Sequence, residues 1–230
     1  MKAQDSSNLL ETRATIIVWD LSLRIFHWVL VLLVISQIIT ATIGGNAMEY
    51  HALGGYTILT LVLFRIMWGF AGGTHARFVD FLRGPATVAR YAQMLFKKTA
   101  ATHRGHNPLG GWSVVLMLVS LLVQAMTGLF ANDDVMMEGP LAKHVSEDAS
   151  ALFTAIHEIN AGILLTLISL HILAVLFYLF RRKQDLIRPM FTGRKPIELA
   201  DGSPSRTGKP WLAVLLLGVS AMVVYFVVTF

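Results

Sequence analysis

Five long runs of apolar residues dominate the chain, and polar segments separate them. The runs cover residues 18–43, 53–71, 111–131, 151–180 and 211–230. A helix needs roughly 20 mostly apolar residues to cross the hydrocarbon core of a bilayer, and each run is close to that length or longer. The strands of a membrane β-barrel would instead alternate over about ten residues. The pattern therefore predicts an all-α, multi-pass membrane protein, with a four-helix transmembrane bundle and a fifth C-terminal transmembrane helix.

The composition agrees with this class and excludes several kinds of site. Only 14% of the 230 residues are charged, against about 25% in soluble domains, and the mean hydropathy is +0.61. The chain has no cysteine. This rules out disulfides, thiolate zinc sites, cysteine-ligated iron–sulfur clusters and covalent haem attached through C-x-x-C-H. Any redox centre must use other ligands, such as histidine or methionine.

Lysine and arginine are distributed unequally between the connections. Residues 74–110 contain six of them and residues 181–210 contain eight, whereas residues 44–52 contain none and residues 132–150 contain only Lys143. Positive connections stay in the cytoplasm. We therefore expect a bacterial inner-membrane protein with a cytoplasmic N-terminus and a periplasmic C-terminus. The net charge of +5 follows from this topology and from contact with anionic lipid, so it is no argument for nucleic-acid binding.

The same pattern divides the chain into four parts. They are a cytoplasmic N-terminal segment (1–17), a four-helix transmembrane domain (18–182), a cytoplasmic linker (183–210) and a fifth transmembrane helix (211–230). The first 15 residues lack the apolar core of a signal peptide, so we expect the first run to be retained. Gly, Pro and Ser between Arg188 and Pro210 favour a flexible linker. The fifth run has no ionisable residue and is expected to pack at the periphery.

A surface helix is predicted between Pro85 and Lys98. Larger apolar side chains recur there at helical spacing among basic residues, namely Val88, Tyr91, Met94 and Leu95. This pattern is typical of an amphipathic helix that lies on the inner face of a membrane.

Four histidines lie within or at the ends of the apolar runs, namely His27, His51, His157 and His171. An ionisable side chain inside a membrane is costly, so each is a candidate for function. His157 and His171 are 14 residues apart, which puts both on one face of a helix, about 21 Å apart along its axis. A single membrane histidine is often only a hydrogen-bonding group between helices, so the arrangement of the four carries the argument.

The predicted topology assigns these histidines to two depths. His51 and His157 fall near the outer ends of their helices, and His27 and His171 fall near the inner ends. Haem iron takes two axial ligands on opposite faces, and both can be neutral imidazoles. The pattern predicts two b-type haems, an outer one between His51 and His157 and an inner one between His27 and His171. No catalytic residue is expected, because both irons would be six-coordinate.

Two further residues are candidates near the inner haem. Arg65 lies 14 residues after His51, so it is expected on the same helix face, where a haem propionate would pair with it; alternatively, it extends to the membrane interface. His106 lies just ahead of the third run and is a weaker candidate for contact with haem or quinone. The remaining histidines are expected in solvated or interfacial connections: His75, His103 and His144.

Small residues follow the two outer histidines along their helices. Gly54 and Gly55 follow one, and Ala161 and Gly162 follow the other. Such positions leave room for a porphyrin, but they also allow helices to pack closely. The sequence leaves both interpretations open.

Five stretches form an ordered set along the chain: VWDLSLRIFHW, YHALGGYTILTLVLFRIMWG, GHNPLGGW, TGLFANDD with a following EGPL, and HEINAGILLTLISLHI. This set resembles the bacterial cytochrome b561 family, which includes the b-type cytochrome subunits of nickel–iron hydrogenases. The resemblance extends from about Val18 to Lys195. It implies that the same four histidines are the axial ligands of two b haems, and that the protein exchanges electrons with the quinone pool. The fifth run looks like an addition to the four-helix pattern.

The leading hypothesis is a diheme membrane cytochrome that transfers electrons between quinone and a periplasmic partner, either a c-type cytochrome or a hydrogenase-like enzyme. A different class is a haem-free transporter whose histidines bind a metal ion or relay protons; such proteins usually show broken helices or inverted repeats. A third hypothesis is a haem-containing anchor for a peripheral dehydrogenase.

Acidic residues gather in the outer connections. They are Glu49, Asp133, Asp134, Glu138, Glu147 and Asp148, offset only by Lys143. Such a surface favours the approach of a basic redox partner, although the same carboxylates also keep the connections solvated and cap helices.

Overall fold

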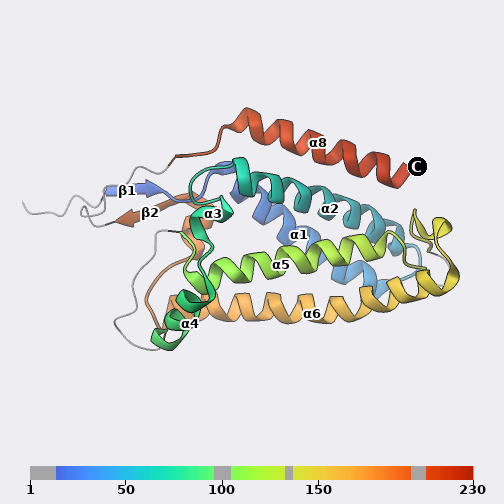
Figure 1. The fold of residues 1–230 in the computed structure, drawn as a ribbon, viewed down its shortest axis with the longest axis horizontal. Coiled ribbons are helices and arrows are strands. Elements are labelled where there is room, and N and C mark those ends of the chain that lie inside the picture. The colour runs from blue at the N-terminus through green and yellow to red at the C-terminus, as the bar shows by residue number, and fades with distance from the viewer. Residues whose placement is uncertain (1–13, 96–104, 133–136, 198–205, 230) are drawn as a thin grey trace, which may run out of the picture.

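The structure is a computed structural model that describes residues 14–95, 105–132, 137–197 and 206–229. Its long helices are α1 (Leu21–Ile43), α2 (Ala47–Ala71), α5 (Pro108–Gly128), α6 (Glu147–Phe180) and α8 (Pro210–Thr229). These five, which run side by side in Figure 1, are each long and apolar enough to cross a membrane. The prediction of a helical membrane bundle with five spans is confirmed.

Short elements cover both ends of the bundle. They are α3 (Phe78–Phe81), α4 (Pro85–Met94), the 3₁₀ helix η1 (Ala142–His144), α7 (Ile187–Thr192) and the strands β1 (Ala14–Ile17) and β2 (Arg194–Ile197). All of them except η1 lie at the end of the bundle where α1, α5 and α8 begin, on the left in Figure 1. The two strands are an addition to the predicted all-α fold.

Polar caps fix where several helices begin. The side chains of Asp20, Asn107 and Ser146 each accept a hydrogen bond from a backbone N–H in the first turn of α1, α5 and α6, respectively. Helix α2 begins at Ala47, ahead of the apolar run, because the Ala, Met and Glu at its start favour a helix. His51 therefore lies one turn inside α2 rather than at its first residue.

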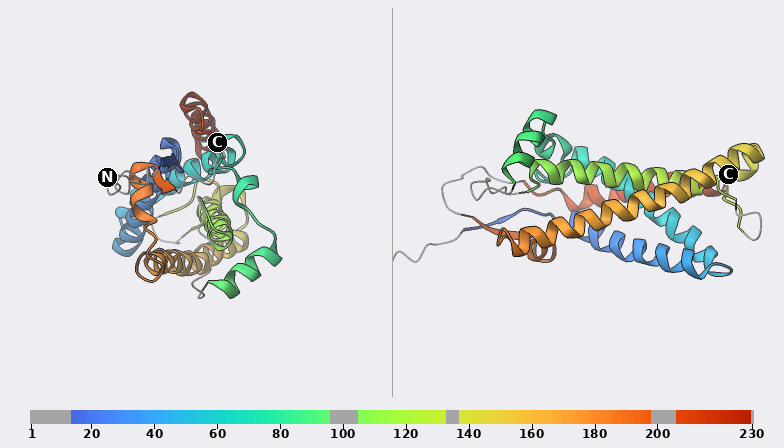
Figure 2. Two further views of the ribbon diagram at one scale, coloured as in Figure 1. Left: turned by 90° about the vertical axis from the view of Figure 1, so that its left-hand side faces the viewer. Right: turned by 90° about the horizontal axis from the view of Figure 1, so that it is seen from below.

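The four helices of the bundle pack mainly in the order α1, α2, α5 and α6. Helix α1 packs along α2, α2 packs against α5, and α5 packs along α6, while α8 lies outside the bundle along α2. Figure 2 shows this arrangement end-on. Within the described ranges, α1 and α6 are not among the helix pairs that pack extensively. These two helices carry His27, His157 and His171, and the fifth helix is peripheral, as expected.

The predicted surface helix is present as α4, which ends at Met94. It is docked to the bundle by a buried hydrogen bond of 2.8 Å between the hydroxyls of Tyr91 and Tyr178, the latter on α6. Residues 96–98 of the predicted helix lie outside the described residues.

The expectation of a flexible linker between Arg188 and Pro210 is wrong for residues 188–197. Helix α7 and strand β2 lie there, and β2 pairs antiparallel with β1. Between them Gly193 has a φ of 76°, in the left-handed region that glycine adopts without strain, and its carbonyl accepts the N–H of Val18 at 2.8 Å. We call β1, α7 and β2 the clasp. Residues 198–205 lie outside the described part of the chain.

Aromatic packing fastens the clasp to α1. The ring of Phe191 in α7 stacks on the indole of Trp28 with ring centres 4.4 Å apart. The indole N–H of Trp28 also donates to the carbonyl of Met190 at 3.2 Å. These contacts hold the segment that follows α6 against the first helix, next to His27.

Candidate functional site

The outer histidines face each other across the bundle. His51 projects from α2 and His157 from α6, and their ring centres are 6.3 Å apart with planes inclined at 69°. The two helices start at the same end of the bundle, so residues distant in sequence reach the same depth. The predicted outer pair is thus brought together.

Both outer rings are held by the same type of contact. The Nδ1 atom of His51 lies 3.2 Å from the carbonyl oxygen of Gln37 on α1. The Nδ1 atom of His157 lies 2.9 Å from the carbonyl oxygen of Gln124 on α5. A carbonyl oxygen can only accept, so Nδ1 carries the proton in each ring. This leaves Nε2 with its lone pair available for a metal.

The spacing of this pair fits two axial ligands of one iron. Metal–imidazole nitrogen bonds are about 2 Å long, and the centre of each ring lies about 1 Å beyond its nitrogen, so two rings on one iron have centres about 6 Å apart. The observed 6.3 Å agrees with this value. The residues present therefore fit a bis-histidine haem at the outer level.

The inner histidines, His27 on α1 and His171 on α6, lie close enough to interact electrostatically. The Nδ1 atom of His27 is buried and makes no hydrogen bond to any described residue, and its ring packs edge-on against Trp28 at 5.0 Å. Among the residues that the structure describes, the inner rings thus have no carbonyl contacts like those that orient the outer ones.

Arg65 is buried deep in the bundle. Only 2% of its surface is exposed, and its guanidinium carbon lies 5.2 Å from the centre of the Phe78 ring. Its Nη1 atom has no hydrogen-bond partner among the described residues, although Asp20 interacts with the guanidinium electrostatically. The protein encloses the guanidinium in this conformation, and its Nη1 donor remains available for an anion.

His106 belongs to the same inner cluster. Its ring lies between Trp19 and Phe81, with ring centres 4.7 and 4.6 Å away, and its Nδ1 is buried. Burial, and then the positive charge of Arg65, lower the pKa of His106 to about 3. The imidazole is therefore neutral at physiological pH. His171 also interacts with it, which ties His106 to the inner histidines more closely than the sequence indicated.

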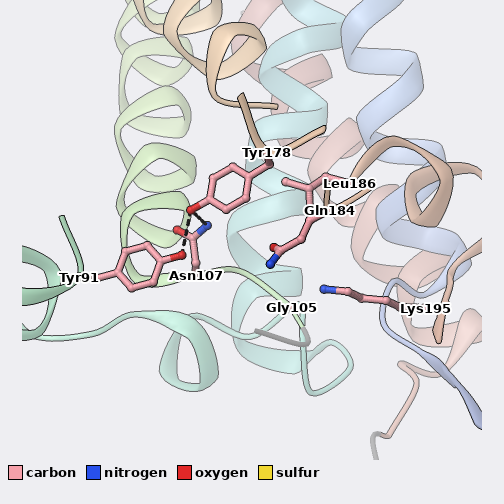
Figure 3. A pocket seen from close by; sticks show the side chains of 7 residues that line it. All are labelled: Tyr91, Gly105, Asn107, Tyr178, Gln184, Leu186 and Lys195. Atoms are coloured by element: carbon pink, nitrogen blue, oxygen red, sulfur yellow. Dashed lines mark hydrogen bonds between the residues drawn. The ribbon is translucent and has the colours of Figure 1, made fainter. Parts of the chain in front are cut away.

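A small cavity adjoins this cluster at the beginning of α5. Figure 3 shows Tyr91, Asn107 and Tyr178 on one side of it and Lys195 on the other. The amide of Asn107 donates to the Tyr178 hydroxyl at 2.9 Å, and burial lowers the pKa of Lys195. The cavity volume of about 20 Å³ is enough for one water molecule.

The glycines near the outer histidines have different surroundings. A Cβ on Gly54 would lie 2.1 Å from the side-chain nitrogen of Gln37, whereas a Cβ on Gly162 would meet nothing within 4 Å. Gly54 therefore lets α1 and its glutamine approach α2 closely, while Gly162 borders open space. Of the other predicted positions, His144 is exposed in η1, and His103 lies outside the described residues.

The contacts of Gln37 and Gln124 with the outer histidines were not predicted from the sequence. Each glutamine is followed three residues later by a threonine, Thr40 in α1 and Thr127 in α5, and each threonine hydroxyl also reaches the histidine Nδ1, at 3.2 and 3.3 Å. The repeated Gln-x-x-Thr at the ends of two apolar runs was the available signal. This pattern can be interpreted only once it is known which helices pack against each other.

Comparison with known proteins supports one family. The family described as prokaryotic cytochrome b561 matches residues 18–193. The chain is also similar to a probable Ni/Fe-hydrogenase B-type cytochrome subunit of Azotobacter vinelandii, with 25% identity over 154 residues. That alignment covers 56% of this chain and 64% of the relative, just under two thirds of its length. No solved structure matches. The match to the family over most of the chain shows that it belongs to the prokaryotic cytochrome b561 family.

Proposed function

We propose that this protein is a diheme membrane cytochrome that carries electrons between the quinone pool and a periplasmic redox partner. The observation that supports it best is the outer pair, with ring centres 6.3 Å apart and both Nδ1 atoms bound to carbonyls. His51 and His157 would hold the outer haem, and His27 and His171 the inner one. When bound, each haem supplies a one-electron carrier.

In this proposal, the residues around the inner haem neutralise its charge and line its site. Arg65 offers a guanidinium with an unused donor to a propionate of the inner haem. His106 is neutral and packed between two aromatic rings, so it lines the inner site without adding charge. Residues 18–182 would form the haem domain, and residues 211–230 would be an added helix.

The partners follow from the family and from the expected orientation. Quinone dissolves in the bilayer and reaches the bundle from the side. The relative in A. vinelandii is a probable subunit of a Ni/Fe hydrogenase, so a hydrogenase-like enzyme or a c-type cytochrome is the proposed periplasmic partner. It would dock over the acidic outer connections, of which Asp133 and Asp134 lie outside the described residues.

Haem content and quinol reactivity test this function together. The purified protein should contain about two non-covalently bound b haems per chain by the pyridine haemochrome assay, and added quinol should reduce them. Covalently retained haem or a single haem would contradict the diheme assignment. Absence of haem, with histidine-dependent metal or proton uptake into vesicles, would favour the alternative of a transporter. Rapid exchange with hydrogenase but none with quinol would support the anchor hypothesis.

Reporter fusions test the proposed inner-membrane orientation. A reporter that is active only in the periplasm should be active after Phe230 and inactive when the chain is cut after Lys209, ahead of α8. The physical reason is the retention of lysine and arginine in the cytoplasm. A cytoplasm-active reporter at the same two points is the control and should give the opposite result. If both reporters give the reverse result, the haem of His51 and His157 would lie on the cytoplasmic side and that of His27 and His171 on the periplasmic side.

A further inference from the structure

The two outer histidines are held by threonines in nearly identical settings. Thr40 on α1 and Thr127 on α5 are 8% and 7% exposed, and both lie three residues after the glutamine whose carbonyl contacts the same ring. This arrangement recurs in two different pairs of helices, α1 with α2 and α5 with α6. A recurrence in two separate places argues against a chance contact.

The direction of each hydroxyl proton is set by the threonine's own helix. Thr40 Oγ1 donates to the carbonyl of Ser36 at 2.8 Å, and Thr127 Oγ1 donates to the carbonyl of Val123 at 2.7 Å. Such bonds to the residue four positions earlier use the only proton of the hydroxyl. The lone pair of each threonine oxygen is then available to accept the Nδ1–H of the histidine. A protonated Nδ1 thus has two acceptors, one carbonyl and one hydroxyl.

We propose that Thr40 and Thr127 are positioning residues that fix the ring orientation of His51 and His157, whose tautomer the glutamine carbonyls set. This inference rests on the proposed function only in assigning the two rings to one haem. Each ring can pivot about its bond to Cβ, and the carbonyl alone restrains one direction. The hydroxyl adds a second point of contact and holds the two planes at their mutual angle of 69°. Removing such a contact to a metal ligand typically weakens metal binding about 10-fold or more.

The proposal predicts a result that a general loss of stability would not produce. The two threonines lie on different helices, yet they act on ligands of the same haem. Thr40→Val and Thr127→Val should therefore both change the signals of the outer haem and leave the inner haem unchanged. Valine keeps the shape of threonine and removes only the hydroxyl.

Matched controls are available on the lipid-facing sides of the same bundle. Thr57 on α2 and Thr166 on α6 make the same bond to the carbonyl four residues earlier, at 2.8 and 2.9 Å, and both are exposed. Thr57→Val and Thr166→Val remove an identical hydroxyl without a histidine contact. Thr40→Ser and Thr127→Ser restore the hydroxyl.

The first measurement uses the haem-loaded protein. In Thr40→Val and Thr127→Val, the outer haem should dissociate about 10-fold more readily. Its ferric low-spin EPR signal, which depends on the angle between the two imidazole planes, should shift, and its reduction potential should change. The serine variants should return all three values to those of the wild type. Equal changes at both haems, equal changes in the Thr57 and Thr166 controls, or no change at all would overturn the proposal.

The second measurement is independent of haem. In the haem-free full-length protein, NMR of ¹⁵N-labelled histidine should show the Nδ1–H tautomer for His51 and His157. The neighbouring threonine-to-valine change should keep this tautomer, which the carbonyl sets, but should shift the Nδ1 resonance of the affected ring, because its N–H loses one of two acceptors. Nδ1 resonances that do not move in either variant would overturn the proposal, whatever the haem content of the wild type. A wild type that binds no haem while these resonances respond would instead overturn the proposed function alone.

Discussion

Replacing His157 by alanine should lower the haem content of the purified protein from two per chain to one. The remaining haem should be the inner one, because His27 and His171 lie at a separate depth and, among the described residues, make no ring contact with the outer pair. The pyridine haemochrome assay, normalised to protein, measures the change. His171→Ala should remove the other haem and leave the outer pair loaded.

The matched control for this experiment is His144→Ala. That histidine is exposed in η1, at the same end of the bundle as the outer pair, and its loss should leave two haems. If His157→Ala removed both haems, then either the pairing or the independence of the two sites would be wrong. Redox titration of each variant would identify which haem remains.

Replacing Trp68 by alanine should destabilise the protein by about 3 kcal/mol or more. The indole of Trp68 is 0% exposed and stacks on Phe64 with ring centres 5.8 Å apart. Its N–H donates to the Asp20 carboxylate at 3.2 Å, and a Cβ on Gly208 would lie 2.2 Å from its ring. The indole therefore joins α2, the start of α1 and the segment leading into α8, and its removal leaves a cavity at their junction.

Unfolding of the haem-loaded protein in detergent, followed by near-ultraviolet circular dichroism, measures this loss. Trp211→Ala is the control, because it deletes the same ring from a position that is 63% exposed on α8. The control should unfold close to the wild type. Similar losses in the two variants would mean that the junction contributes nothing particular to stability.

The transmembrane helices could be predicted from the sequence because the length of an apolar run is a local property. The proximity of His51 and His157 also followed, since alternation of the spans brings the ends of α2 and α6 to one depth. The start of α2 did not follow in the same way, because residues ahead of an apolar run can either continue a helix or end it.

The contacts between distant segments could not be predicted in this way. The bond from His157 to Gln124 requires knowledge that α5 is the neighbour of α6 on that side. The burial of His106 between Trp19 and Phe81 depends on how the connection after α2 folds back. Strand β2 is only four residues long and contains a proline and two basic residues, so nothing in its own pattern distinguishes it from a linker.

Because its two strands are far apart in the sequence, the clasp forms late during synthesis of the protein. Strand β1 is the first described element to leave the ribosome, but its partner β2 follows only after four of the five long helices. At typical rates of about 5–20 residues per second, β1 waits roughly ten seconds or more for that partner. The first helix therefore enters the membrane before β1, the strand ahead of it, has a partner. Although β1 is synthesised first among the described elements, its pairing with β2 is one of the last contacts to form.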